Sequence, residues 1–388
     1  MYPIVSLHCE DVIMRVSEAR LANLDPPYKA GLPREVVAER FGIPPEDIAK
    51  LGSAENPFGP SPKAQAAIEV GKTKIDLYPE SSSRVLREAI AARYGFEPDC
   101  VACGSGETEI ISFVIRAFSL PGDTILMYEP CFPIYHIFAE NEGRIPAYVK
   151  MGRDFDLVID QYIETLASVA PKIAFITNPH SPSGKLMAEG DIRRICDAAG
   201  ANTLIVLDEA YIHFTETPGG ITLTRDYDNL IVLRTFSKAF GLAGLRVGFG
   251  IAANKELIRP LLNLKPTWNM GAMQVAGGAA AIFDEEHVDR TVKMIVEMRA
   301  YVTEQLSGLN RFRMVPGSRS NFFLLEVIDP SLTSTDVFNG LLERGVIAKD
   351  GSDSFRGLGD RYLRVDVSLK KNMDRLVWAL KDIEAADQ

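Results

Sequence analysis

The chain has 388 residues, 46% of them hydrophobic, which suits one large domain with a smaller one beside it. Its net charge of −10 argues against a surface for nucleic acid or anionic membranes, and no apolar run approaches the roughly 20 residues of a membrane span. The N-terminus lacks the basic region of a secretory signal, and the odd, sparse set of five cysteines is typical of a reduced, cytoplasmic protein that handles small molecules.

The first part of the chain predicts an arm followed by a large α/β domain. Residues 1–50 have little strand pattern and are expected to pack on the smaller domain or on a partner subunit. Between residues 51 and 265, helical and strand patterns alternate. The helical stretches include 107–120 and 191–200, and near-continuous apolar runs occupy 124–128, 172–177, 203–210 and 230–236. Such runs are typical of strands covered on both faces, so we expect a mostly parallel central sheet flanked by helices.

The pattern changes after Asn263. Two long helical stretches, 271–283 and 285–308, precede strand-like segments at 321–327, 346–349 and 362–367, and a closing helix covers about 371–385. This order predicts a smaller α+β domain over residues 266–388.

Cys100 and Cys103 form a CxxC pair at the start of a strand-like run. A zinc site would need a second pair of ligands at similar spacing, which the sequence lacks. The preferred interpretation is two small buried side chains, with a redox pair as the alternative.

A glycine-rich loop, Gly104-Ser105-Gly106-Glu107-Thr108, lies between a strand and a helix. Its backbone N–H groups and the helix N-terminus can bind a phosphate. The loop lacks the third glycine of a dinucleotide fingerprint and the Gly-Lys-Ser/Thr end of a P-loop. A tight turn with a helix cap is the structural alternative.

Two charged residues end neighbouring apolar strands. Asp208 follows four apolar residues and is costly to bury without a cation. Taken alone, it could also be a metal ligand, a helix cap or part of a salt bridge. Lys238 ends the next strand, where its amine is expected to have a lowered pKa, although a surface lysine is the common case. The phosphate loop, the carboxylate and the amine fall on one sheet edge. Pyridoxal phosphate needs all three.

The order of these motifs resembles the fold-type-I aminotransferases of class I/II. The motifs are SGETE (105–109), NPHSPSG (178–184), DEAY (208–211) and TFSK (235–238), with Arg246 eight residues after Lys238. Segments 28–42, 48–64, 78–95 and 234–250 are most similar to histidinol-phosphate aminotransferases. The motifs are specific for the cofactor and less specific for the reaction.

The resemblance implies a role for each matching residue. Lys238 would bind the cofactor covalently and carry a proton, Asp208 would keep the ring nitrogen protonated, and Tyr211 would donate to the ring oxygen O3′. Phe132 would stack on the ring. The phosphate would be held by Thr235, Ser237, Arg246 and the backbone of Gly106, Glu107 and Thr108. Tyr78 would reach the phosphate of the other subunit, which implies a homodimer. Arg364 would bind the substrate carboxylate, and Tyr28 would also contact the substrate.

Three positions depart from the family pattern. Ser181 stands where the family usually has an asparagine donating to O3′. Lys349 stands where histidinol-phosphate enzymes have an arginine for the substrate phosphate, and it lacks the planar fork of that residue. Asp366 shares a strand face with Arg364, where it either orients the arginine or favours a cationic substrate. Lys349 and Asp366 argue against histidinol phosphate as the preferred substrate.

Several reactions remain open at this point. Transamination is the favoured prediction. A threonine-phosphate-decarboxylase-like decarboxylation and a capreomycidine-synthase-like elimination or cyclisation of an arginine-like amino acid would use Lys238 in the same way. A binding protein on an inactive scaffold is disfavoured by the joint presence of Lys238, Asp208, Tyr211 and Arg246.

Overall fold

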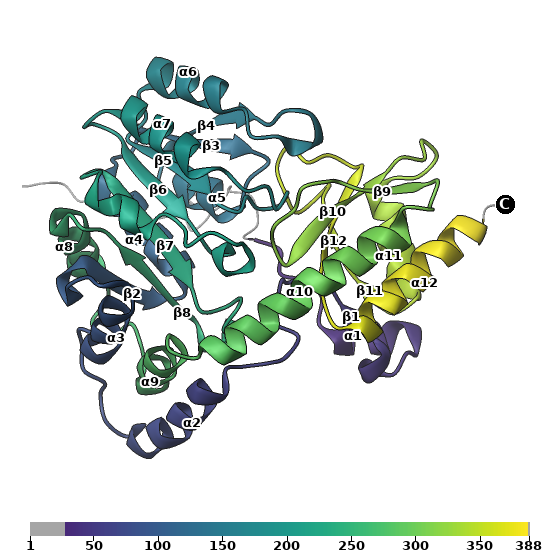
Figure 1. Cartoon of the computed structure of the whole chain (residues 1–388), viewed down its shortest axis with the longest axis horizontal. Coiled ribbons are helices and arrows are strands. Elements are labelled where there is room, and N and C mark those ends of the chain that lie inside the picture. The colour runs from purple at the N-terminus through teal and green to yellow at the C-terminus, as the bar shows by residue number, and fades with distance from the viewer. Residues whose placement is uncertain (1–27, 387–388) are drawn as a thin grey trace, which may run out of the picture.

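The structure is a computed structural model that describes residues 28–386. Residues 1–27, with most of the predicted arm and Cys9, lie outside the described residues. The chain forms two lobes joined by the long helix α10 (Glu285–Leu306), which runs from one lobe into the other (Figure 1). No helix within residues 28–386 is long and apolar enough to cross a membrane.

A seven-stranded sheet forms the centre of the larger lobe. The strands lie in the order β2 (Val101–Ser105), β8 (Val247–Ile251), β7 (Leu230–Thr235), β6 (Leu204–Asp208), β5 (Ile173–Thr177), β3 (Thr124–Glu129) and β4 (Ile145–Lys150). Only β8 runs antiparallel to its neighbours, and the pairs from β7 to β4 are parallel. The predicted mostly parallel sheet is therefore confirmed.

Both faces of this sheet are buried, as its continuous apolar runs predict. Along β6, Ile205 and Leu207 pack into one core, while Leu204 and Val206 pack into another on the opposite face. The helices of this lobe are α2 (Pro62–Gly71), α3 (Arg84–Tyr94), α4 (Glu107–Phe118), α5 (Ile134–Asn141), α6 (Ile159–Val169), α7 (Glu189–Ala199), α8 (Lys255–Leu264) and α9 (Ala272–Ala281).

The smaller lobe contains a four-stranded antiparallel sheet, as the predicted α+β domain requires. Its order is β12 (Lys349–Asp350), β13 (Tyr362–Asp366), β10 (Phe322–Val327) and β9 (Phe312–Met314). Helices α10, α11 (Ser334–Glu343) and α12 (Lys370–Ala386) accompany it, and β1 (Ala49–Lys50) pairs with β11 (Val346–Ile347).

The first described helix, α1 (Arg34–Phe41), belongs to the smaller lobe. Its Val37 packs with Ile48, Leu342 and Ile347. Helix α9 packs on α2 and α3 in the larger lobe although it follows residue 265. The domain boundaries at 50/51 and 265/266 stay predictions.

The four described cysteines are buried and free, at Cys100, Cys103, Cys131 and Cys196. Burial raises the pKa of the Cys103 thiol to about 12, which keeps it as an unreactive thiol. Within residues 28–386, no group of three or more histidine, cysteine or acidic side chains is arranged to hold a metal ion.

Candidate active site

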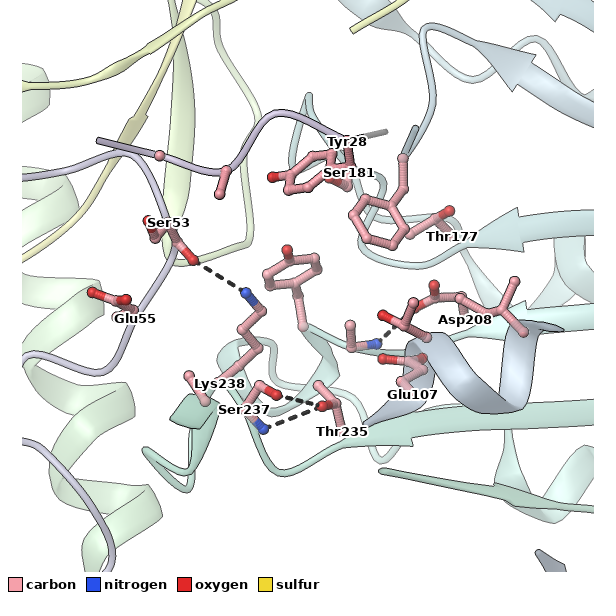
Figure 2. Close-up of a pocket in the computed structure, with 18 of the residues that line it drawn as sticks. Tyr28, Ser53, Glu55, Glu107, Thr177, Ser181, Asp208, Thr235, Ser237 and Lys238 are labelled. Carbon is pink, nitrogen blue, oxygen red and sulfur yellow. Dashed lines mark hydrogen bonds between the residues drawn. The ribbon is translucent and has the colours of Figure 1, made fainter. Parts of the chain in front are cut away.

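Three parallel strands end together at one edge of the large sheet. Thr177, Asp208 and Thr235 are the last residues of β5, β6 and β7, and Thr177 and Asp208 are paired in register. This edge, the start of α4 and the segment after β7 enclose a cavity of about 250 Å³. Figure 2 shows that Tyr28 and Ser53 enter the same space from the N-terminal segment.

Most of the predicted site residues line this cavity. They are Tyr28, Glu107, Thr108, Phe132, Ser181, Asp208, Tyr211, Thr235, Ser237, Lys238, Arg246 and Arg364. Gly106 lies beside them in the backbone of the α4 N-terminus. Tyr78, Lys349 and Asp366 do not line the cavity.

Lys238 directs its amine into the cavity (Figure 2). Its Nζ donates to the carbonyl of Ser53 at 3.3 Å and lies 5.3 Å from the centre of the Tyr211 ring. Desolvation lowers the pKa of this amine, and the Arg364 guanidinium lowers it further. A lysine with a lowered pKa is a stronger nucleophile near neutral pH.

Asp208 is held by two donors at the end of β6. Its Oδ2 accepts the hydroxyl of Tyr135, and its Oδ1 accepts the backbone N–H of Ala210 at 3.0 Å. Burial raises the pKa of Asp208, while the hydrogen bond from Tyr135 opposes this by stabilising the carboxylate. These two hydrogen bonds fix the direction of the carboxylate.

Tyr135 and Thr177 are two site residues that the sequence prediction missed. The Tyr135 hydroxyl lies 2.8 Å from Thr177 Oγ1 and, because it donates to Asp208, accepts from that threonine. The ring of Tyr135 lies 5.6 Å from that of Phe132, edge to face. Phe132 and Tyr135 are three residues apart in the sequence, and the Tyr135 N–H donates to the Phe132 carbonyl at 3.2 Å in the turn that leads into α5.

The N-terminus of α4 and Arg246 form a cradle for an anion. Gly106 has φ 79° and ψ 162°, and a Cβ at this position would overlap the guanidinium of Arg246. Arg246 Nη1 lies 3.4 Å from Ser237 Oγ, which accepts from Thr235 Oγ1 at 3.0 Å. Backbone N–H groups, two hydroxyls and one guanidinium thus converge, as a phosphate site requires.

Three residues that line this cavity each have a buried polar atom with no hydrogen-bond partner among residues 28–386. These atoms are Ser181 Oγ, Glu107 Oε1 and Arg364 Nε. Buried polar atoms are nearly always paired in native structures, so an unpaired hydroxyl lining a cavity points to a polar ligand. The anion cradle, the Asp208 carboxylate, the Lys238 amine and the Ser181 hydroxyl together fit pyridoxal phosphate.

Arg364 brings a second cation to the cavity from β13 in the smaller lobe. It is buried, donates to the carbonyl of Gly52 at 3.0 Å, and lies 5.0 Å from the ring centre of Phe322. Its Nε is 3.7 Å from Asp366 Oδ1, while Asp366 Oδ2 accepts the backbone N–H of Ala54. Asp366 is therefore an ion-pair neighbour of Arg364 without a hydrogen bond between these two atoms, and its role in orienting Arg364 stays a prediction.

Lys349 and Tyr78 lie outside the cavity wall. Lys349 Nζ donates to the carbonyl of Lys29 and sits 4.9 Å from the ring centre of Tyr28. Burial lowers its pKa to about 8. Tyr78 is 79% exposed and stacks on Trp268, with ring centres 4.3 Å apart.

The fold and the site together match one family of enzymes. The chain belongs to the aminotransferase class I and II family, which it matches over residues 46–380. It is therefore a pyridoxal-phosphate-dependent aminotransferase, as the resemblance in the sequence implies.

Similar proteins carry a more particular name. The chain is 37% identical to the histidinol-phosphate aminotransferase of Anaeromyxobacter sp. (strain Fw109-5), over 93% of this chain and 97% of that protein. It is 35% identical to histidinol-phosphate aminotransferase 1 of Mesorhizobium japonicum, over 92% and 95%. The fold is that of the Sinorhizobium meliloti histidinol-phosphate aminotransferase solved in complex with pyridoxal-5′-phosphate. The TM-score is 0.82 at 21% identity, and 93% of this chain and 96% of that chain are covered.

The fold alone does not separate the reactions of this class. The L-threonine-O-3-phosphate decarboxylase of Porphyromonas gingivalis has a TM-score of 0.76 at 20% identity, covering 87% of this chain and 99% of that one. The family match and the curated relatives favour transamination over the decarboxylase and cyclase alternatives.

Proposed function

We propose that this aminotransferase acts on histidinol phosphate. The similarity to histidinol-phosphate aminotransferases over nearly the whole chain supports this substrate. The observation that carries the proposal is Arg364, a buried guanidinium lining the same cavity as the Lys238 amine, because it offers a phosphate a charge-assisted hydrogen bond. Asp366 does not line this cavity, and its Oδ2 accepts the backbone N–H of Ala54.

The proposed cofactor site assigns each group of pyridoxal phosphate to residues of this cavity. The α4 N-terminus, Thr235, Ser237 and Arg246 would hold its phosphate, and Phe132 would stack on its ring. Asp208 would face the ring nitrogen. Tyr211 and Ser181 offer hydroxyls to O3′, and the shorter Ser181 forms the weaker of these bonds.

The proposed mechanism divides binding from proton transfer. When bound, pyridoxal phosphate supplies an electron sink for the carbon that carries the substrate amine. Lys238 would hold the cofactor through its Nζ, and in the neutral form this amine would move a proton at the carbon that carries the substrate amine. The lowered pKa of Lys238 suits this task, because only the neutral amine accepts a proton. Asp208 stabilises positive charge on the ring nitrogen, and Arg364 orients the substrate anion.

We also propose a cytoplasmic homodimer in which Tyr78 of each subunit reaches the site of the other. An exposed apolar surface around Tyr78 supports a subunit interface there: Val70, Ile75, Leu77, Val85 and Trp268 are all at least 46% exposed. Exposed apolar clusters of this kind are typical of protein–protein contacts. The four buried free cysteines fit a reducing compartment.

The test is a half-reaction with single substrates. The cofactor-loaded enzyme is mixed with histidinol phosphate, glutamate or arginine, and its absorption spectrum is followed. We expect conversion to the amino form of the cofactor with histidinol phosphate and glutamate, and none in Lys238→Ala. Exposed Lys255 provides the control variant Lys255→Ala, which should behave as wild type.

Other outcomes would overturn the proposal. Carbon dioxide release from an amino-acid substrate without conversion of the cofactor would indicate a decarboxylase. Turnover of arginine in preference to histidinol phosphate would indicate a cationic substrate.

A further inference from the structure

Glu107 carries a buried carboxyl group whose side chain has no role in the proposed cofactor site. It is the first residue of α4, where only its backbone contributes to the anion cradle. The residue is 8% exposed and lines the cavity, and its Oε1 has no hydrogen-bond partner within residues 28–386. An ionised carboxyl group that is buried without a partner is costly, so such a group either lies near a cation or carries a proton.

The charged and titratable groups facing Glu107 come from several elements. Asp208 and Glu209 lie on and after β6, Tyr135 on α5, and Tyr211 and Lys238 on the segments beyond. The guanidinium of Arg246 lies against the preceding residue, Gly106. Of these, Asp208 is in hydrogen-bond contact with the Glu107 carboxyl. Figure 2 shows the two carboxyl groups next to each other on the same side of the cavity.

The two nearby cations have other partners or a weakened charge. Arg246 donates to the carbonyl of Ala243 at 3.1 Å and lies 3.4 Å from Ser237 Oγ. The pKa of Lys238 is lowered by desolvation. Two ionised carboxylates in contact at a buried site repel each other strongly, so one of the pair must carry a proton.

The hydrogen bonds decide which of the two carboxyl groups carries the proton. Asp208 accepts two donors, the Tyr135 hydroxyl and the Ala210 N–H, and both stabilise its ionised form. Glu107 has no comparable donors on Oε1. Burial and the neighbouring Asp208 raise the pKa of Glu107 well above its ordinary range. The proton therefore belongs on Glu107.

We propose that Glu107 is a neutral carboxylic acid that donates a hydrogen bond to Asp208, so that the cofactor ring nitrogen faces a carboxyl pair with one negative charge and one proton. Glu107 is then a positioning residue, because it acts through Asp208. The Asp208 carboxylate then has three donors: Tyr135, the Ala210 N–H and Glu107. Together they fix the direction of the Asp208 carboxylate and delocalise its negative charge. The inference rests on the proposed role of Asp208 opposite the ring nitrogen.

Infrared difference spectroscopy of the cofactor-loaded protein tests the protonation state directly. The spectrum of wild type minus Glu107→Gln should contain the C=O stretching band of a protonated carboxylic acid. Glu109→Gln is the matched control on the same helix, since Glu109 Oε2 accepts from the Ser105 N–H at 2.6 Å and from Asn269 at 2.7 Å. That variant should lose carboxylate bands instead.

Loss of carboxylate bands in Glu107→Gln would overturn the proposal. If this variant does not fold, wild-type protein with ¹³C-labelled glutamate replaces it. The acid band must then shift with the label, and a spectrum without such a band would equally overturn the proposal.

A pH titration of the visible band of the bound cofactor provides the second readout. Glutamine keeps a donor and no charge, so the midpoint of Glu107→Gln should equal that of wild type. An ionised Glu107 would instead make the variant's midpoint fall by about 1 pH unit or more, because a negative charge near the cofactor would be lost. That fall would overturn the proposal.

Asp208→Asn separates this inference from the proposed function. Loss of its charge should lower the midpoint whatever the state of Glu107. A midpoint unchanged in Asp208→Asn would refute the role of Asp208 at the ring nitrogen, while the infrared result would still report on the proton of Glu107.

Discussion

At the scale of single residues, Gly106 shows how one backbone conformation creates a binding site. Its φ of 79° and ψ of 162° lie in a region that is essentially restricted to glycine. The conformation turns the chain from β2 into α4 and leaves the first N–H groups of the helix facing the cavity. The missing side chain makes room for the Arg246 guanidinium. A residue with a side chain would prevent both the exposure of these N–H groups and the close approach of Arg246.

Gly106→Ala should weaken cofactor binding. The strained backbone costs about 1–3 kcal/mol, and the added Cβ displaces Arg246, so affinity should fall at least about tenfold. Equilibrium titration of the protein with pyridoxal phosphate measures this. Gly190→Ala is the control, since a Cβ there meets no atom within 4 Å. Equal affinities in the two variants would contradict the cradle.

Because Lys349 is buried, we expect the free energy of unfolding to depend on pH. Burial lowers its pKa from 10.5 to about 8, so between these values the unfolded chain holds a proton that the folded chain does not. The cost of burying its charge is present below pH 8 and disappears as the pH rises to 10.5. Wild type should therefore gain stability relative to Lys349→Met across this window. Urea unfolding of both proteins at several pH values measures the difference, and a constant difference would contradict the buried charge.

At the scale of elements, the ends of β6 and β7 have cavity-lining residues on one side and a buried ion pair on the other. Asp208 and Thr235 point into the cavity, while the adjacent Glu209 and Arg234 form a buried ion pair at 2.7 Å. Arg234 also donates to the carbonyl of Pro218 at 2.8 Å, and Glu209 accepts the Gly220 N–H at 2.5 Å. The pair therefore ties both strand ends to the loop before η7 (Ile221–Arg225).

Removing one partner of this pair should destabilise the protein strongly. Arg234→Met leaves the Glu209 carboxyl buried without its cation, which costs about 3–5 kcal/mol. The double variant Arg234→Met/Glu209→Met should recover part of this loss, because no charge stays buried. Chemical denaturation of wild type, the single variants Arg234→Met and Glu209→Met, and the double variant gives the comparison. A double variant as unstable as the sum of its single variants would show that the pairing itself contributes little.

At the scale of the whole molecule, the site depends on both lobes. The larger lobe supplies Asp208, Lys238 and the anion cradle, and β13 of the smaller lobe supplies Arg364. The segment that carries Tyr28 crosses between them. Tyr78, in contrast, faces outward on its own chain, as a residue serving another subunit would.

The proposed dimer predicts complementation between inactive subunits. Tyr78→Ala and Lys238→Ala should each lower activity as homodimers. A mixed dimer regains one site with an intact Lys238 from one chain and an intact Tyr78 from the other. After equal mixing and reassociation, roughly a quarter of wild-type activity should return. Sedimentation measures the assembly state, and a mixture no more active than its components would exclude a shared site.

The sequence by itself determined the elements and the chemistry of this protein. The apolar runs that became β3, β5, β6 and β7 are continuous because both faces of the sheet are covered, and this signal is local. Lys238, Asp208 and the loop before α4 were identifiable because charged or glycine residues after buried strands need a partner. Short or interrupted segments such as β4 and β8 gave weaker patterns.

Only the tertiary structure decided which groups meet. Tyr135 and Asp208 are 73 residues apart in the chain and form a hydrogen bond, and Asp366 reaches the N–H of Ala54 across 312 residues. The orientation of Asp366 and the contact between Glu107 and Asp208 depend on how the two lobes and the strand ends pack. Such contacts carry no local sequence period, because they arise from packing between distant elements. The composition of the site was therefore readable from the sequence, while the partners of its carboxyl groups were not.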